Sequence, residues 1–387
     1  MISKAIGGGL LLVGTSIGAG MLALPLVLAK VGFLYSLILL CLCWLIMYLG
    51  ARYILEVNAS FAPGSHLVSM AKARLGLPGQ ILAWISCLCL LYSLLAGYIA
   101  GGSDVSKNIL HNFGVNLSDN FCTIGFTLTL GLIVYAGIKV VDYVNRVLMF
   151  GKLGIFIVVS LLLFPSIKTP NLAFGSFAEV SSCLMILITS FGFASIVPSL
   201  YYYFNNEVNT LRKVLFWGSL VPLVAYVVWL LVMMGALPKN GVHSLGAISL
   251  STHPLGGLIN SLQQELGIGF IEKFFTLFTV ICLLTAFLGV ALGLFDFLKD
   301  GCKLQKSGIQ GLVLFSLTFF PPMLVVLFNP GIYIHALSYA GRCCVLLLLI
   351  LPSLMLLRSP QKTYSRVVGG RVGAALVFVI AVILLFM

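Results

Sequence analysis

The sequence Thr15-Ser16-Ile17-Gly18-Ala19-Gly20 interrupts an apolar segment near the start of the chain, and Pro25 follows it. A second copy of the pattern, Thr189-Ser190-Phe191-Gly192-Phe193, interrupts another apolar segment and is followed by Pro198. Each copy lies near the middle of a hydrophobic segment that is long enough to cross a bilayer. Paired, glycine-containing interruptions in corresponding membrane segments are typical of the midplane binding site of a transporter.

The composition excludes a water-soluble domain. Sixty per cent of the 387 residues are hydrophobic and only 8% are charged, so a soluble surface could not be covered. The net charge of +12 follows from a cytoplasmic excess of Lys and Arg, and no basic run with interleaved aromatics indicates nucleic-acid binding. The ten cysteines lie mostly in apolar runs without metal-site spacing. We therefore expect a polytopic membrane protein with no metal and no cofactor.

Apolar runs between charged clusters predict eleven transmembrane helices. The first run is too long for a signal peptide and lacks a cleavage site, so we interpret it as a helix. Residues 65–76 suit an amphipathic helix on the membrane surface, and residues 239–271 are expected to form an external cap with short helices. The predicted spans are 5–29, 33–56, 80–103, 121–139, 147–165, 180–203, 214–236, 273–297, 311–328, 332–356 and 372–387.

The distribution of basic residues predicts the orientation. With the N-terminus inside, sixteen Lys and Arg fall on the cytoplasmic side and five on the other, which leaves Arg342 within a helix. We therefore expect a cytoplasmic N-terminus and an external C-terminus. We also expect Arg342 to face the protein interior, because exposure of a charge to lipid is costly.

The two copies of the pattern predict an internal repeat. Five helices precede the second copy and five begin with it, so the two interrupted helices run in opposite directions. The predicted fold is all-α, a single transmembrane domain over residues 1–387 with a five-plus-five inverted repeat. Repeat one covers about 5–165, repeat two about 180–356, and an extra helix about 372–387.

Helix interruption frees backbone groups, which survive at membrane depth only against protein or a water-filled cavity. Free N–H groups at the start of a half-helix favour a carboxylate, and free carbonyls accept from an ammonium group. A zwitterionic amino acid presents both groups. The alternative is close helix packing by small residues. The candidate substrate-binding residues are Gly14, Thr15, Ser16, Gly18, Ala19, Gly20, Ser190, Phe191, Gly192 and Phe193.

The expected pocket is neutral, because Glu56 and Asp296 lie at helix ends and no other acidic residue lies deep in a helix. Tyr92 and Phe287 join the candidate list because their helices are expected to face the site. Together with the aromatic residues of the second copy, they favour a large apolar or aromatic substrate. With 27 Phe and 14 Tyr in the chain, an aromatic residue is more often scaffold than pocket, and this alternative is weakest for Phe191 and Phe193.

Three segments carry a resemblance to a known family. They are Gly14-Thr15-Ser16-Ile17-Gly18-Ala19-Gly20-Met21-Leu22-Ala23-Leu24-Pro25, the second copy with Ile196-Val197-Pro198-Ser199-Leu200, and Thr285-Ala286-Phe287-Leu288-Gly289-Val290 with Gly293-Leu294-Phe295-Asp296. These resemble helices one, six and eight of the hydroxy and aromatic amino acid permeases. The resemblance implies a LeuT-like fold with broken helices one and six in a bacterial inner membrane. It also implies proton-driven import of tyrosine, or next of tryptophan. The family's serine and threonine carriers leave another neutral amino acid as the alternative.

The same resemblance implies an ion-coupling pair. Related proton-coupled carriers place a lysine of helix five where sodium-coupled relatives hold an ion, which points to Lys152 with Thr285 nearby. The alternative for Lys152 is a side chain that reaches the cytoplasmic interface. A proton is therefore expected as the coupled ion rather than sodium. An embedded enzyme or a channel is the competing class, but no catalytic motif or polar ring supports either.

Overall fold

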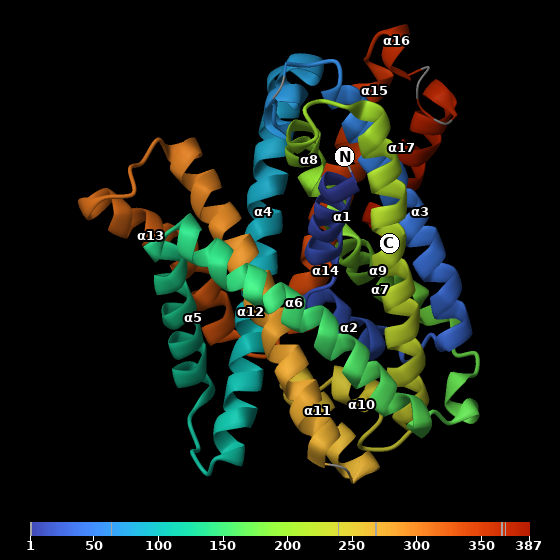
Figure 1. The fold of residues 1–387 in the computed structure, drawn as a ribbon, viewed down its shortest axis with the longest axis vertical. Helices are drawn as coiled ribbons and strands as arrows, with labels where there is room; N and C mark the ends of the chain where they lie inside the picture. Colours follow the sequence, from blue (N-terminus) through green and yellow to red (C-terminus); the bar gives the residue numbers. More distant parts are fainter. Residues whose placement is uncertain (1, 63, 239, 268, 365–366, 368) are drawn as a thin grey trace.

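The computed structural model describes residues 2–62, 64–238, 240–267, 269–364, 367 and 369–387. Its described part is a bundle of helices elongated in one direction (Figure 1). No strand occurs among these residues apart from an isolated bridge between Gly32 and Phe174. The predicted all-α membrane fold is confirmed.

The first half of the chain contains six α-helices. They are α1 (Ile2–Ser16), α2 (Ala19–Leu28), α3 (Phe33–Asn58), α4 (Leu67–Asn112), α5 (Asp119–Ala136) and α6 (Ile138–Leu163). Three short 3₁₀ turns follow, at Phe164–Ser166, Thr169–Leu172 and Phe177–Glu179.

The second half begins with another interrupted helix, and its elements include a 3₁₀ segment, η4, and a π-helical segment, η5. They are α7 (Val180–Ser190), η4 (Gly192–Ile196), α8 (Val197–Tyr203), α9 (Val208–Ala236), α10 (Leu245–Ser249), α11 (Pro254–Leu266), α12 (Gly269–Cys302), α13 (Gly308–Phe328), α14 (Tyr333–Cys344), η5 (Val345–Ile350), α15 (Leu351–Leu357), α16 (Gln361–Tyr364) and α17 (Gly370–Phe386).

Nine helices of the described part are long and apolar enough to cross a membrane, or ten if α1 and α2 form one span bent by 50°. The apolar helix α17 is shorter, with 17 residues. Every predicted span overlaps one of these helices. The five-plus-five arrangement and the eleventh crossing remain predictions.

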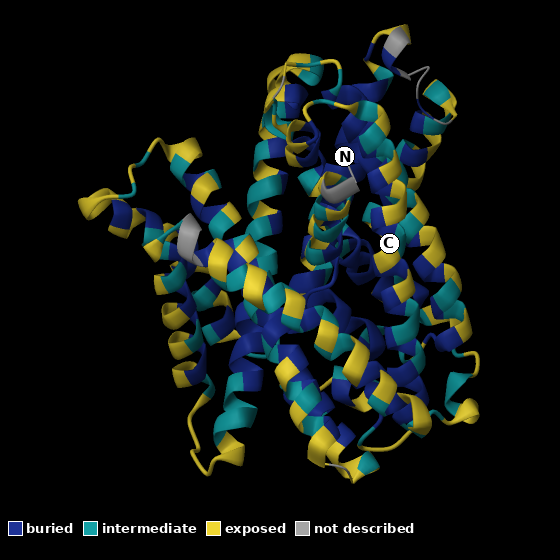
Figure 2. Cartoon of the chain, in the orientation of Figure 1, coloured by how far each residue is buried: buried dark blue, intermediate teal, exposed yellow. Residues whose placement is uncertain are grey.

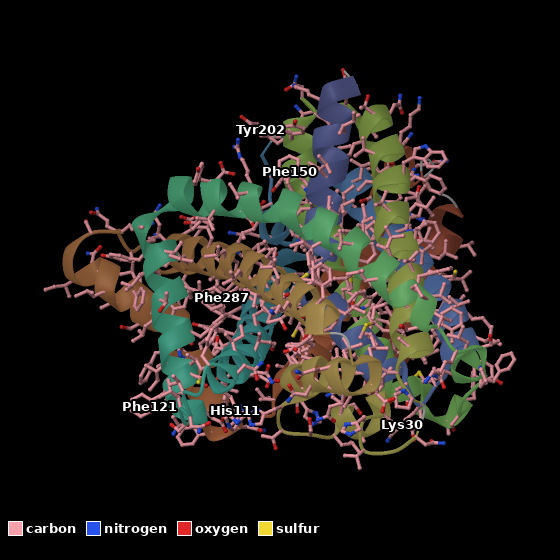
Figure 3. All side chains as sticks on the ribbon, turned by 60° about the horizontal axis from the view of Figure 1, so that its bottom comes forward. Lys30, His111, Phe121, Phe150, Tyr202 and Phe287 are labelled. Carbon is pink, nitrogen blue, oxygen red and sulfur yellow. The ribbon has the colours of Figure 1, made fainter. Side chains whose placement is uncertain are left out.

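Exposed residues lie along the outside of the bundle (Figure 2), and many of them are large and hydrophobic. Phe121 and Phe150 are 70% and 73% exposed, and Figure 3 shows both at the periphery. Exposed aromatic side chains of this size are unfavourable in water but suit contact with lipid. The burial pattern is therefore that of a bundle whose apolar belt faces a bilayer.

The two ends of the bundle differ. Helices α10 and α11 lie at one end, and α8, α15 and α16 lie at the other (Figure 1). The expected surface helix forms the start of α4, where Gly76 has a φ of 75° and separates it from the spanning part by a kink. The expected cap consists of α10 and α11, which contact α2, α4 and α12.

The prediction that Arg342 faces the protein interior is wrong. Its side chain is exposed, and the guanidinium lies 5.4 Å from the ring centroid of Tyr339. The reason is the composition of α14, whose small residues Ala336, Ala340 and Gly341 occupy the buried face. That face packs against α4 and α7, so Arg342 lies on the opposite side of the helix together with Tyr339.

Candidate functional site

The first helix break lies between α1 and α2. Helix α1 ends at Ser16, Gly18 is extended with φ −156° and ψ −152°, and α2 begins at Ala19. The last carbonyls of α1 and the first N–H groups of α2 therefore have no partner within their own helix. The break coincides with the first copy of the sequence pattern.

The second break lies between α7 and α8. Helix α7 ends at Ser190, η4 continues the chain as a 3₁₀ segment, and α8 begins with Pro198 in its first turn. Proline suits this position because its missing N–H would have no helix partner there. The second copy of the pattern is therefore also a place where regular α-helix stops, but the axis bends less than at the first break.

The two breaks are in direct contact. A Cβ atom at Gly20 would lie 3.1 Å from Ser190 Oγ and 3.5 Å from Ser190 Cα. This close approach leaves little room for a side chain at the start of α2. Elements that are 170 residues apart in the sequence thereby bring their freed backbone groups together.

A buried tyrosine of α9 connects the breaks. The hydroxyl of Tyr226 lies 2.6 Å from the carbonyl oxygen of Ser16 and 2.7 Å from that of Ser190. A second buried tyrosine, Tyr333 of α14, donates to the carbonyl of Ala19 over 2.6 Å. Neither residue was predicted to be functional; the available signal was that a tyrosine in an apolar helix needs an acceptor for its hydroxyl.

Lys152 reaches the first break from α6. Its Nζ donates to the carbonyl of Ile17 over 2.5 Å and to Thr285 Oγ1 of α12 over 3.4 Å. The side chain does not extend to the membrane surface, because the residue is only 1% exposed. The structure thus brings together both residues of the expected ion-coupling pair at the break in helix one.

The hydroxyl residues of the two copies have different environments. Thr15 is exposed and donates to the carbonyl of Leu12, whereas the buried Ser16 hydroxyl has no hydrogen-bond partner in the described part of the chain. Thr189 donates to Met185 and to Leu337 of α14, so it joins two helices. Only Ser16 offers an unused buried hydroxyl at the breaks.

The remaining residues of the two copies are mostly buried. Phe191 and Phe193 are fully buried, and the ring of Phe191 lies 5.1 Å from that of Tyr226. A Cβ atom at Gly18 or Gly192 would have only ordinary contacts, whereas one at Gly14 would collide with the Met149 side chain. Gly18 and Gly192 therefore have room for a methyl group.

Tyr92 and Phe287 are not brought to the breaks by any contact in the described structure. The Tyr92 hydroxyl donates to the carbonyl of Leu317 in α13. Phe287 stacks with Phe319 and meets Phe126 edge-on, and Figure 3 shows it between α12 and α5. These contacts give both side chains a role in packing the helices around α13.

A cavity of about 720 Å³ approaches the first break from the end of the bundle that carries α8. It lies between α1 and α8, and its lining includes Thr15, Ile196, Ser199 and Tyr203. The opposite end is covered by α11, whose first N–H groups bond to Asp104 of α4.

No group of three His, Cys, Asp or Glu residues in the described ranges could hold a metal ion. The chemistry that the breaks offer is that of hydrogen-bond donors and acceptors, with one buried amine beside them. Broken helices that meet at mid-span, with a cavity leading to them, define a membrane transport protein.

Comparison with known proteins gives the family. The sequence model of the tryptophan/tyrosine permease family matches residues 1–387, so the chain belongs to this family. Its members are permeases, and the chain is accordingly a transport protein and not an enzyme. Figure 1 thus shows the fold of an amino acid permease.

Individual relatives cover almost the whole chain. The chain is 36% identical to the tyrosine-specific transport system 2 of Haemophilus influenzae, over 99% of this chain and 95% of that protein. It is 30% identical to a tryptophan-specific transport protein of the same organism, over 98% and 93%. It is 31% identical to glutamine transporter 2 of Aliivibrio fischeri, over 94% and 91%.

A solved structure supports the fold. A manganese transporter mutant, H236A, from Eremococcus coleocola superposes with a TM-score of 0.63, covering 98% of this chain and 84% of that one. The sequence identity is 13%, so this likeness concerns the fold alone. The fold is therefore LeuT-like.

Proposed function

We propose that the protein imports an aromatic amino acid, tyrosine first and tryptophan second, by proton symport and alternating access across a bacterial inner membrane. The observation that carries the proposal is the contact between the two helix breaks, where carbonyls from both meet at one hydroxyl. Backbone groups freed at mid-span from two opposed helices suit a ligand with both an acidic and a basic group.

The two ends of an amino acid fit different halves of the site. The substrate carboxylate would accept from the freed N–H groups at the start of α2, where the helix dipole favours an anion. The unpartnered hydroxyl of Ser16 would add a donor beside it. The substrate ammonium would donate to the carbonyls of Ser16 and Ser190, which lie together.

The substrate side chain is proposed to be aromatic. Phe191 and Phe193 at the second break are apolar but fully buried in this conformation, so they would contact a substrate ring only after a local rearrangement. Relatives named for tyrosine and tryptophan transport at 36% and 30% identity support the same class. The 31% identity to a glutamine transporter makes another neutral amino acid the second candidate, together with the family's serine and threonine carriers.

Lys152 is proposed to carry the coupled proton. A buried ammonium group is costly without a carboxylate partner. Among the described residues, the hydrogen-bond partners of Lys152 are the Ile17 carbonyl and the Thr285 hydroxyl. Loss of its proton would change the hydrogen bond that ties α6 to the first break. The protonation of one amine would thus be linked to the position of helix one.

The proposed orientation places the cavity on the cytoplasmic side. The predicted cytoplasmic side has sixteen Lys and Arg and the other side has five. This excess favours a cytoplasmic position for the end that carries α8, with the N-terminus inside and the C-terminus outside. The cavity beside Thr15 would then be the route to the cytoplasm, and α11 would close the external side. Alternating access would close the cytoplasmic route and open the external side, with the breaks between them.

Uptake into proteoliposomes tests the proposal. Purified protein is reconstituted, an inward proton or sodium gradient is imposed, and labelled L-tyrosine is followed with excess tryptophan, phenylalanine, glutamine or serine as competitor. The proposal predicts accumulation with the proton gradient alone and strong competition by tryptophan. Accumulation that needs sodium, or the absence of tyrosine uptake, would contradict it.

A further inference from the structure

The Tyr226 hydroxyl has one hydrogen and two acceptors. It lies 2.6 Å from the Ser16 carbonyl oxygen and 2.7 Å from the Ser190 carbonyl oxygen, so the two oxygens share a single donor. Both distances are those of strong hydrogen bonds. Tyr226 is fully buried, and its ring contacts Phe191, which holds the hydroxyl between the breaks.

The position of this hydroxyl is also the position that suits a substrate amine. An ammonium group bonds to carbonyl oxygens at 2.7–2.9 Å and has three hydrogens, enough to serve both oxygens fully. A hydroxyl and an ammonium cannot both lie within this distance of the same two oxygens without colliding. Substrate binding therefore requires that the hydroxyl moves away.

We propose that Tyr226 is a positioning residue that substitutes for the substrate ammonium group while the transporter is empty. Its hydroxyl then serves the two carbonyls, holds the ends of α1 and α7 together, and yields its place when an amino acid binds. This inference rests on the proposed function. The empty transporter thus needs its own hydrogen-bond donor for these carbonyls while it returns to the outward-facing conformation.

The reason is the cost of a bare carbonyl at mid-membrane. A buried acceptor without a donor is unfavourable, and in the empty state both carbonyls would lack one if the hydroxyl were removed. The loaded state would not need the hydroxyl, because the substrate supplies the hydrogens. Removal of the hydroxyl should thus slow the return of the empty transporter and spare the loaded step.

Two transport modes separate these steps. Net uptake includes the return of the empty transporter, whereas exchange of internal for external amino acid proceeds through loaded states only. We expect Tyr226→Phe to lower net uptake of labelled tyrosine about tenfold and to leave exchange within about twofold of the unmodified protein. Equal losses in both modes, or no loss in either, would overturn the inference.

Tyr333→Phe is the matched control. Tyr333 is also a buried tyrosine that donates over 2.6 Å at the first break, but only to the Ala19 carbonyl of α2. Its removal should therefore leave the ratio of net uptake to exchange unchanged. A fall in the ratio as large as that of Tyr226→Phe would mean that the bridge between the breaks is not the cause.

A rescue variant covers the case in which Tyr226→Phe does not reach the membrane. Substitution of 4-aminophenylalanine at position 226 keeps the ring shape and supplies two N–H donors, one for each carbonyl. The inference predicts the original ratio of net uptake to exchange and a higher KM for tyrosine, because the donor is harder to displace. A ratio well below the original would overturn it. If the unmodified protein shows neither uptake nor exchange, the proposed function itself fails.

Discussion

The Nζ of Lys152 in α6 lies 2.5 Å from the carbonyl oxygen of Ile17, a residue inside the first helix break. This contact ties the buried amine of Lys152 to the segment that the proposed alternating access would move. Thr285 of α12 completes the arrangement at 3.4 Å. Helices α6 and α12 therefore meet the first break at one amine.

Replacement of Lys152 should uncouple transport from the proton gradient. Lys152→Met keeps a similar length without the charge, and we expect gradient-driven accumulation of tyrosine to fall about tenfold or more because no group carries the proton. Exchange at equal pH should persist. The exposed Lys168, changed to Met, is the control and should transport normally. Uptake by Lys152→Met with an unchanged pH dependence would exclude the role.

The glycines at the breaks should tolerate a methyl group but not a long side chain. A Cβ atom would lie 3.6 Å from the Ala286 Cβ at Gly18 and 4.0 Å from the Cys344 Sγ at Gly192, which are ordinary contacts. We expect Gly18→Ala and Gly192→Ala to transport within about threefold of the unmodified protein. Gly18→Leu and Gly192→Leu should abolish uptake while the protein remains in the membrane. Normal uptake by both leucine variants would argue against a substrate between the breaks.

Gly20 provides a contrast at the same break. A Cβ atom there would lie 3.1 Å from Ser190 Oγ, so Gly20→Ala should push the two breaks apart. We expect a larger loss of uptake than for Gly18→Ala, although the same methyl group is added. Equal activity of the two alanine variants in the uptake assay would show that the contact between α2 and α7 is not required.

The cap over the end opposite the cavity should be held more firmly at low pH. His253 Nδ1 lies 3.4 Å from Asp104 Oδ1, and Asp119 and Lys107 are its other charged neighbours. The hydrogen bond to Asp104 raises the pKa of His253 above its ordinary value of 6.5, and the nearby carboxylate charges add to this. The protonated imidazole therefore stabilises the cap fully below pH 6.5, and this contribution is lost as the pH rises through the raised pKa.

Hydrogen exchange of the α11 amides, corrected for intrinsic rates, measures this effect. Protection should be greater at pH 6 than at pH 9, and His253→Gln should remove the difference. The exposed His111, changed to Gln, is the control and should leave the difference in place. Protection that is independent of pH in the unmodified protein would contradict the prediction.

Asp104 should contribute to stability as a cap supplied by another helix. Its Oδ2 accepts from the N–H groups of Leu255 and Gly256, at 2.8 and 3.1 Å, in the first turn of α11. Loss of such a cap costs about 1 kcal/mol, so Asp104→Ala should lower the Tm of the detergent-solubilised protein by about one degree. An unchanged Tm in a thermal unfolding assay would show that the carboxylate does not hold α11.

The sequence predicts some features better than others, for physical reasons. Spans can be located because hydropathy depends on composition alone, and the breaks follow from glycine and downstream proline in apolar helices. The face on which a side chain lies is harder to predict. Arg342 shows this: its helix position is clear, but its exposure depends on which face of α14 carries the small residues that pack on α4 and α7.

Contacts between distant helices were the least predictable. Tyr226 is one of 14 tyrosines in the chain, and nothing near it in the sequence indicates that its hydroxyl meets two carbonyls of other helices. Phe287 lies on α12, which is buried on several sides, so periodicity could not tell the side facing α5 and α13 from the side facing the breaks. The Lys152 contact was expected only through resemblance to related carriers.

The central claim is that the breaks bind the two charged ends of one amino acid. Equilibrium binding of labelled L-tyrosine to the purified protein tests it, with tyramine and 3-(4-hydroxyphenyl)propionate as competitors that each lack one end. The account predicts that unlabelled L-tyrosine displaces the label and that both analogues, at about a hundredfold higher concentration, do not, since each loses bonds to the backbone. Displacement by either analogue as effectively as by tyrosine would contradict it.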